Sequence, residues 1–332
     1  MLSVKIQCPA KINLTLKVLD KRPDGFHNIE SVMQTISLYD YLTINVEPAE
    51  TLQIKLSGNS KEIPYNEKNL VYKAAKLFCE ELNKSKTESD ISVILRAEPE
   101  ESQNIKRSFA LLRMTNNFNC KISINIEKNI PVAAGLAGGS TDAAGTIFGL
   151  NEIFKKPFSQ EKLHELCAQL GSDLNVCLTG GRVLSKGRGE IVEPLEFEPF
   201  NLSLIKPENL GISAKEAYEK FAKKHPSPQP SPSKGEGDFA LLPTLTLPNK
   251  GGSILSNSGE GFKRSDFQND LEWAIIDDYK ELQEIKSKYP SAVMSGSGST
   301  YYIINDIFQN QKGYWISNNL FAVEFGVAVY NH

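Results

Sequence analysis

Apolar and polar residues alternate strictly near the start of the chain, over residues 10–19. One set of positions is apolar and the other is polar: Ile12, Leu14, Leu16 and Val18 against Lys11, Asn13, Thr15 and Lys17. A period of two predicts a strand with one buried face. Residues 41–48 and 51–58 predict two further strands, and residues 121–133 predict a strand that leads into a glycine-rich segment.

Other segments have the spacing of helices. Residues 69–84 carry apolar side chains at helical intervals, and residues 159–173 do the same, with Ser159 as the candidate N-cap and Gly171 as the stop signal. Residues 175–190 resemble a hairpin that turns at Gly180-Gly181. Strands and helices follow no strict βαβ order, which predicts an α+β fold.

Two segments depart from this pattern. Residues 84–119 have mixed charge and weak periodicity, and residues 224–265 are rich in proline, glycine and serine. The second composition favours extended or disordered chain. We interpret both segments as surface insertions.

The composition is typical of a globular protein of about two domains, with 332 residues that are 40% hydrophobic and 23% charged. A net charge of −3 gives no basic field that would favour nucleic acid or an anionic membrane. No apolar run approaches the ~20 residues of a transmembrane helix, and the first residues lack the pattern of a signal peptide. Five scattered cysteines without a C-x-x-C pair predict reduced thiols in a cytoplasmic protein and argue against a zinc site.

The segment "NIPVAAGLAGGSTDAAG", residues 129–145, suggests an anion site. Gly135, Gly138 and Gly139 let backbone N–H groups approach a ligand without obstruction by a Cβ atom. Ser140 can cap a helix that follows, and the N-terminus of such a helix attracts phosphate. The segment matches neither the Walker A loop nor G-x-G-x-x-G. The alternative is a helix entry packed tightly on a sheet.

Two further features bear on this site. The segment "SAVMSGSGSTYYII", residues 291–304, predicts a strand, a loop rich in serine and glycine, and another strand. Such a loop is often only a hairpin turn, but it supports a ligand site if the fold brings it to the glycine-rich segment. Lys11 and Asn13 share the polar face of the first strand, where a lysine is usually a solvated surface charge.

These motifs together resemble the GHMP small-molecule kinases, in residues 9–40, 130–145 and 292–303. The resemblance covers nearly the whole chain outside the two insertions, and three motifs in the same order are specific. It is strongest to the branch that acts on diphosphocytidyl-methylerythritol. The resemblance implies ATP with Mg²⁺, and transfer of the γ-phosphoryl group to the 2-hydroxyl of that small molecule.

The resemblance also implies a two-domain fold with the active site in the cleft. Residues 1–157 would resemble the second domain of ribosomal protein S5, with the insertion near 84–119. Residues 158–332 would form a ferredoxin-like domain, with the insertion near 224–265. Metal ligands are not assigned, and a monomer and a homodimer both remain open.

Residue roles follow from the same resemblance. Lys11 and Asp142 match a catalytic pair in which Asp142 accepts the proton of the attacking hydroxyl and Lys11 orients the pair and stabilises negative charge. A carboxylate in the first helical turn is stabilised in its charged form and is then a weaker base, so the alternative is a residue that only complements the helix dipole. The residues expected to bind ATP are Pro131, Val132, Ala133, Ala134, Gly135, Leu136, Ala137, Gly138, Gly139, Ser140, Thr141 and Asn69. The residues expected to bind the second substrate are Asn13, Phe26, His27 and Ser297.

The chain departs from its relatives at two positions. Many relatives have tyrosine where this chain has Phe26, and they often have an aromatic residue near the position of Leu184, as a second wall around the cytosine. Two other functions stay open: a GHMP kinase for mevalonate, homoserine or a sugar, and a nucleotide-binding protein without activity. The segment "RPDGFHNIES" favours the diphosphocytidyl substrate over the first of these.

Overall fold

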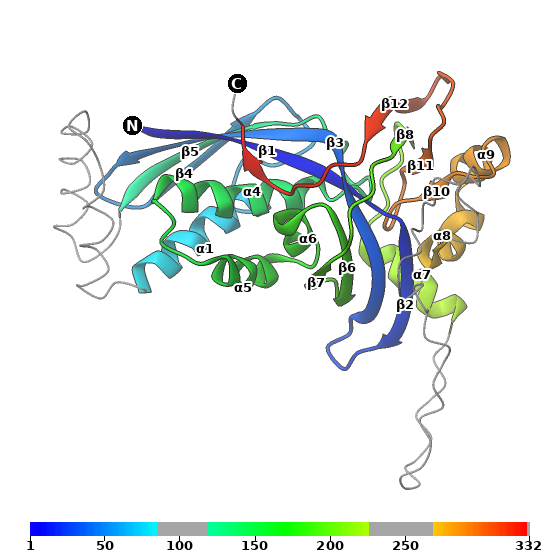
Figure 1. Ribbon diagram of the computed structural model, residues 1–332, viewed down its shortest axis with the longest axis horizontal. Coiled ribbons are helices and arrows are strands. Elements are labelled where there is room, and N and C mark those ends of the chain that lie inside the picture. Colours follow the sequence, from blue (N-terminus) through cyan, green and yellow to red (C-terminus); the bar gives the residue numbers. More distant parts are fainter. Residues whose placement is uncertain (85–118, 226–267, 331–332) are drawn as a thin grey trace, which may run out of the picture.

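The computed structural model describes residues 1–84, 119–225 and 268–330. Both predicted insertions lie almost wholly outside these ranges. The described part forms two β-sheets that follow one another along the long axis of the molecule, each covered by its own helices (Figure 1).

The larger sheet is organised around the long strand β3 (His27–Pro48). This strand pairs antiparallel with four others, β1, β2, β5 and β6. The other described strands of this sheet are β1 (Leu2–Asn13), β2 (Thr15–Lys21), β4 (Gln53–Gly58), β5 (Cys120–Glu127), β6 (Arg182–Gly187), β7 (Ile191–Pro194), β9 (Gln268–Asn269) and β13 (Ala328–Val329). The predicted strand over residues 10–19 is divided by a bend at Leu14 into β1 and β2, although the backbone N–H of Leu14 still donates to Val32 O of β3 (2.8 Å).

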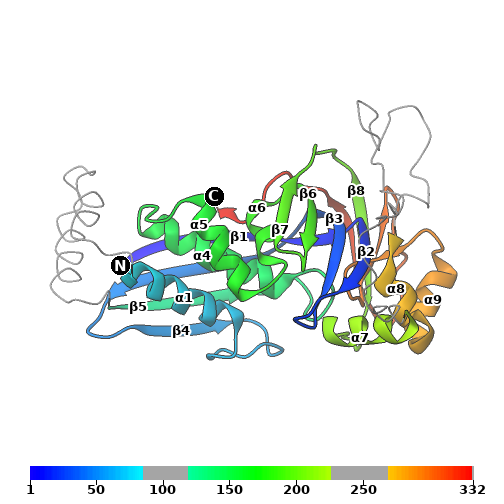
Figure 2. The same ribbon diagram turned by 90° about the horizontal axis from the view of Figure 1, so that it is seen from below.

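Helices cover one face of this sheet (Figures 1 and 2). They are α1 (Leu70–Lys84), α4 (Gly138–Ile153), α5 (Gln160–Leu170) and α6 (Leu174–Thr179). Alternate residues of the strands, such as Ile6, Ile44 and Ile124, pack in one cluster with Phe78 of α1 and Ile147 of α4. The two helices predicted from periodicity are confirmed as α1 and α5.

The second sheet has the order β10-β11-β8-β12. Its strands are β8 (Asn201–Pro207), β10 (Val293–Met294), β11 (Tyr301–Ile304) and β12 (Tyr314–Phe321), and it packs with α7 (Ala214–Lys224), α8 (Asp270–Ile275), the 3₁₀ turn Ile276–Asp278 and α9 (Lys280–Lys288) (Figure 2). A separate cluster, which includes Ile12, Ile36, Leu204 and Tyr302, joins the two sheets.

One predicted element is wrong. Residues 174–179 form helix α6 rather than the first arm of a hairpin, and the hairpin is β6–β7, which turns at residues 187–190. Gly180 ends the helix with φ +70°, and a Cβ atom there would lie 1.7 Å from the backbone nitrogen of Gly326. Close packing against the C-terminal segment, a contact remote in sequence, therefore decides the local conformation.

The predicted division at residue 157 remains a prediction. Residues 160–194 contribute α5, α6, β6 and β7, which pack on or extend the first sheet. In the ranges that the structure describes, no helix combines the length and apolarity needed to cross a membrane. The five cysteines are all buried and free of disulfides.

Asn269 ties the start of α8 to the serine- and glycine-rich loop. Its Oδ1 accepts from the backbone N–H groups of Leu271 (2.9 Å) and Glu272 (3.3 Å), and its Nδ2 donates to the carbonyls of Met294 (2.7 Å) and Gly296 (2.8 Å). Losing four buried hydrogen bonds costs more than losing a cap alone.

We therefore expect Asn269→Ala to lower the free energy of unfolding by about 1–3 kcal/mol, measured by urea denaturation. Ser213→Ala is the matched control, because Ser213 Oγ caps α7 by accepting from Glu216 N. If both variants lost the same free energy of unfolding, the hydrogen bonds from Asn269 to the loop would contribute nothing to stability.

Candidate active site

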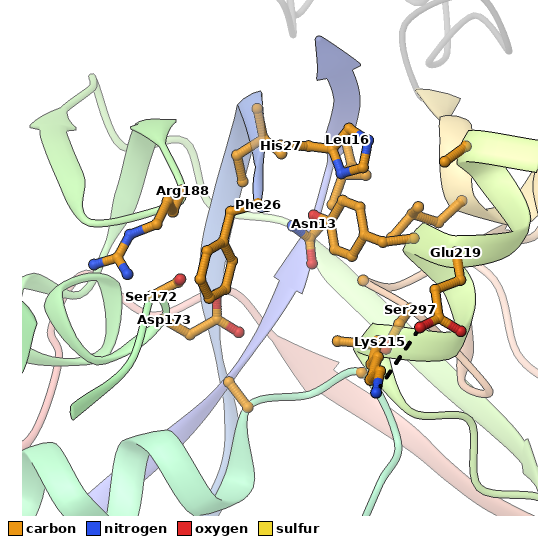
Figure 3. Close-up of a pocket in the computed structure, with 18 of the residues that line it drawn as sticks. Asn13, Leu16, Phe26, His27, Ser172, Asp173, Arg188, Lys215, Glu219 and Ser297 are labelled. Carbon is orange, nitrogen blue, oxygen red and sulfur yellow. Dashed lines mark ion pairs between the residues drawn. The ribbon is translucent and has the colours of Figure 1, made fainter. Parts of the chain in front are cut away.

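A pocket of about 760 Å³ opens between the two sheets. It is lined by the end of β1, the turn before β3, the glycine-rich loop, helix α7 and the serine- and glycine-rich loop (Figure 3). Among the predicted site residues, those that line it are Lys11, Asn13, Phe26, His27, Gly135, Ala137, Ser140 and Ser297. The fold therefore gathers residues from all three motifs around one cavity.

The glycine-rich loop and the serine- and glycine-rich loop contact each other directly. Ser295 Oγ donates to Gly135 O (3.0 Å), and the backbone N–H of Thr300 donates to Ala134 O (3.3 Å). Gly135 has φ +74°, and a Cβ atom there would lie 2.1 Å from Ser295 O. Gly135 is thus required for the packing of the two loops.

The other two glycines differ in what surrounds them. A Cβ atom on Gly138 would lie 3.0 Å from Lys128 Nζ, whereas one on Gly139 would meet nothing within 4 Å. Helix α4 begins at Gly138 after Ala137, which has φ 58° and provides no side-chain cap, so the prediction that Ser140 caps this helix is wrong. An uncapped helix start beside open space suits an anion such as a phosphate.

Lys11 is buried at the base of the pocket, with 3% of the residue exposed. Its Nζ donates to Asn13 Oδ1 (2.7 Å) and Gly135 O (3.2 Å) and lies 3.5 Å from Asp173 Oδ2. Asp173 is the N-cap residue of α6, yet its side chain makes no capping hydrogen bond. Asp173 lines the pocket instead (Figure 3), and its carboxylate lies beside the ammonium group of Lys11.

Asp142 lies elsewhere, and the predicted pairing of Lys11 with Asp142 differs from the structure. The Asp142 carboxylate is 3.0 Å from Lys128 Nζ, which also pairs with Asp40. Asp142 is 2% exposed and is not one of the residues that line the pocket. Burial raises its pKa to about 8, although Lys128 acts in the opposite direction. On this carboxyl, burial therefore acts against the effect of the helix dipole.

Phe26 and His27 extend from neighbouring positions to different parts of the pocket (Figure 3). Phe26 is an exposed residue, with 54% of its surface accessible. The His27 ring stacks on Tyr218 of α7, with 5.6 Å between ring centres. Burial, together with the nearby charge of Lys21, lowers the pKa of His27. A neutral imidazole offers one donor and one acceptor, which suits the edge of a base.

Two residues singled out from the sequence lie away from the pocket. Asn69 caps helix α1, because its Oδ1 accepts from Val71 N (2.9 Å) while its Nδ2 donates to Pro64 O (2.7 Å). Leu184 is buried in the cluster between the sheets and is not one of the lining residues. Its place beside a base remains a prediction that this geometry does not favour.

Several lining residues received no role from the sequence: Asp173, Arg188, Lys215, Tyr218 and Glu219. The sequence places Asp173 just after Gly171, the predicted stop signal of a helix, and the structure makes it the N-cap residue of α6. That position is equally typical of an ordinary N-cap. Within the described residues, no three His, Cys, Asp or Glu side chains gather as a metal cluster. This still fits Mg²⁺ of a nucleotide, which is held mainly by phosphates and water with one or two carboxylates.

The raised pKa of Asp142 predicts a pH-dependent stability. Between the unfolded pKa of about 4 and the folded pKa of about 8, the folded protein holds a proton that the unfolded chain releases. This contribution is complete below the unfolded pKa and is lost as the pH rises through the folded one. Asp142→Asn is neutral throughout and should gain about 1 kcal/mol or more relative to the unchanged protein between pH 5 and pH 8.

The measurement is urea denaturation of both proteins at the two pH values. Glu50→Gln, a change of the same kind at an exposed position, serves as the control and should show no such gain. A stability difference for Asp142→Asn that is independent of pH would mean that Asp142 is charged in the folded state.

Comparisons with known proteins identify the family of this chain. Residues 103–181 match the GHMP kinases N terminal domain family. The 4-diphosphocytidyl-2-C-methyl-D-erythritol kinase of Heliobacterium modesticaldum is 36% identical over 311 residues, which cover 90% of this chain and 84% of the relative. The enzyme of the same name from Lachnoclostridium phytofermentans is 35% identical, with 93% and 89% covered.

Solved structures show the same fold. A crystal structure of 4-(cytidine 5'-diphospho)-2C-methyl-D-erythritol kinase aligns with a TM-score of 0.59 at 23% identity, covering 96% of this chain and 99% of that one. Homoserine kinase from Cytophaga hutchinsonii aligns with the same TM-score at 13% identity, covering 99% and 98%. The predicted two-domain GHMP kinase fold is thereby confirmed. Because the curated relatives exceed 30% identity over most of both chains, the protein belongs to the 4-diphosphocytidyl-2-C-methyl-D-erythritol kinase family of GHMP kinases.

Proposed function

We propose that this protein transfers the γ-phosphoryl group of ATP to the 2-hydroxyl of 4-diphosphocytidyl-2-C-methyl-D-erythritol. The observation that carries this proposal is the Lys11–Asp173 pair, which lies in one pocket with the glycine-rich loop and with Phe26 and His27. The names of the curated relatives support the choice of substrate. We further propose a cytoplasmic location.

Asp173 is the base in this proposal. Its carboxylate accepts the proton as the substrate oxygen forms a bond to the γ-phosphorus. The bond from that phosphorus to the bridging oxygen breaks, and its electron pair leaves with ADP. Asp173 suits the role better than Asp142 because it is directed into the pocket, whereas Asp142 is buried against Lys128. A transition state of this kind is often loose, so the position of the base matters as much as its strength.

Lys11 positions Asp173 and supplies positive charge. Asn13 Oδ1 and the carbonyl of Gly135 hold its ammonium group in place, so that little rearrangement is needed when charge develops. The start of α4 at Gly138 and Gly139 offers backbone N–H groups to the phosphates. Mg²⁺, bound with ATP, would neutralise charge on the phosphate oxygens.

In this proposal, Phe26 and His27 bind the cytosine ring of the substrate. The exposed ring of Phe26 offers a face for stacking, and such a contact contributes about 1–3 kcal/mol per base. The His27 ring is fixed by its stacking on Tyr218 and offers polar atoms to the edge of a pyrimidine. Together they give a physical reason for choosing a cytidyl substrate over the substrates of other GHMP kinases.

We expect Asp173→Asn to lower kcat by about 10²–10⁴-fold, the usual contribution of a positioned base. Lys11→Met should lower kcat too, and the double variant should lose less than the product of the two losses because the residues act together. The measurement is a coupled kinase assay with the diphosphocytidyl compound, mevalonate and homoserine side by side.

Asp142→Asn is the comparison for this experiment, and it should keep kcat within about tenfold because the amide can still accept a hydrogen bond from Lys128. If Asp142→Asn abolished turnover while Asp173→Asn did not, the sequence-based choice of Asp142 would be correct. If the enzyme phosphorylated mevalonate or homoserine in preference to the cytidyl compound, the proposed substrate would be wrong. Absence of turnover with all three, in protein that binds ATP, would favour a nucleotide-binding protein without activity.

Gly139→Val tests the phosphate site. Its new side chain would occupy the open space beside the helix start, so the affinity for ATP should fall by about tenfold or more, with little change in Tm. Gly149→Ala in the same helix is the opposite control, because its Cβ would press on Ile44 and Ile6 at 2.7–2.8 Å and lower Tm without touching ATP. Titration calorimetry and thermal unfolding measure the two effects. Normal ATP affinity in folded Gly139→Val would place the phosphates elsewhere.

A further inference from the structure

The buried carboxylate of Glu272 joins helix α8 to the serine- and glycine-rich loop. Glu272 is 8% exposed, and its Oε2 accepts from the backbone N–H of Met294 (3.1 Å). Met294 is the last residue of β10 and directly precedes Ser295, the first residue of the loop. The phosphoryl transfer proposed above does not use this carboxylate.

A lysine of the following helix holds the other oxygen of the carboxylate. Lys286 Nζ on α9 is 2.8 Å from Glu272 Oε1, and it also donates to the carbonyl of Ala292 just before β10. The centre of the Tyr301 ring on β11 is 5.8 Å from the same ammonium group. Helices α8 and α9 pack with β11 in one buried cluster (Figure 1). A buried charge is costly unless it is paired and hydrogen-bonded, so these partners fix Glu272 in one place.

The residues that follow β10 lie against the reactive groups of the site. Ser295 Oγ accepts from the backbone N–H of Asn13 (3.3 Å) and donates to Gly135 O. An added Cβ atom at Gly296 would lie 3.0 Å from Gly135 O and 3.3 Å from Lys11 Nζ. The backbone of the loop is thus in close contact with Lys11. Packing of this kind transmits a displacement of the loop to the ammonium group.

We propose that Glu272 is a positioning residue for phosphoryl transfer, which fixes the serine- and glycine-rich loop against Lys11 through the backbone N–H of Met294. This rests on the proposed function, because the place of Lys11 matters for turnover. Asn269 Nδ2 donates to the carbonyl of Met294 from the start of the same helix. The start of α8 therefore holds Met294 by both of its backbone polar groups.

Glu272 could instead contribute only to the stability of the second sheet, as one half of an ion pair with Lys286. The two roles depend on different features of the side chain. The ion pair needs the negative charge, whereas the hydrogen bond from Met294 needs only an acceptor oxygen. Glutamine keeps the acceptor without the charge, and leucine removes both while keeping an apolar side chain of similar size.

The experiment compares Glu272→Gln/Lys286→Met with Glu272→Leu/Lys286→Met. Both double variants lack the ion pair and leave no unpaired buried charge, so they differ mainly in the acceptor for Met294 N. We expect the leucine variant to lower kcat by about tenfold or more, because a misplacement of about 1 Å can cost about 10²-fold, while KM for ATP changes by less than about threefold. The glutamine variant should keep kcat within about threefold. Hydrogen exchange at residues 293–300, followed by mass spectrometry, should be faster in the leucine variant than in the glutamine variant.

Two controls accompany these variants. Glu281→Leu, the same substitution at an exposed position of α9, should change neither kcat nor exchange in the loop. Thermal unfolding of each variant shows that the assays are made on folded protein. If the leucine variant does not fold, Glu272→Met/Lys286→Met replaces it, because a methionine side chain adapts to an irregular space.

Equal kcat in the two double variants would overturn the proposal and leave Glu272 as half of a structural ion pair. Equal losses of kcat with equal exchange in the loop would also overturn it, because the charge rather than the acceptor would then matter. Both results leave the proposed function intact when the unchanged protein turns over the cytidyl compound. If the unchanged protein binds ATP but phosphorylates none of the small molecules, the proposed function fails and this proposal fails with it.

Discussion

The buried carboxylate of Asp40 attaches the glycine-rich loop to the long central strand. Its Oδ1 accepts from the backbone N–H groups of Asn129 (2.6 Å) and Ile130 (2.9 Å), and Lys128 pairs with the same carboxylate. Asp40 is fully buried, where an unsatisfied charge would be costly, so these donors are needed for the fold as well as for the loop. The entrance to the loop is thereby fixed relative to β3.

The position of the reactive groups follows from this attachment. Leu136 O accepts from the backbone N–H of Lys11 (3.1 Å), and Gly135 O accepts from its ammonium group. Lys11 in turn lies beside Asp173, so a carboxylate on the central strand determines the place of the base through a short chain of contacts. Lys11 and Asn13 are therefore not solvated surface residues, whereas Lys17 further along the same face is exposed.

The sequence predicted the elements whose periodicity reflects burial on one face, such as β4, α1 and α5. It also identified eight of the residues that line the pocket, because glycines and hydroxyl residues in ordered motifs are a strong signal. It could not predict α6, whose helical form depends on packing against residues near 326. For a similar reason, the sequence could not show which of Asp142 and Asp173 faces the pocket. Each is an acid near a helix start, and only the tertiary structure shows that one is buried against Lys128 while the other faces Lys11.

Strands β1 and β2 pair with segments from the C-terminal part of the chain, which has a consequence for folding during translation. Ile6 of β1 pairs with Val329, Thr15 of β2 pairs with Gln268, and the hydroxyl of Tyr302 donates to Asn13 O. Contacts between residues so distant in sequence form slowly, because a large loop of chain must be closed first. While the ribosome is still making the last quarter of the chain, the strand that carries Lys11 lacks these partners. We therefore expect the catalytic centre to be assembled only after translation of the chain is nearly finished, which makes nascent chains of this protein candidates for chaperone binding.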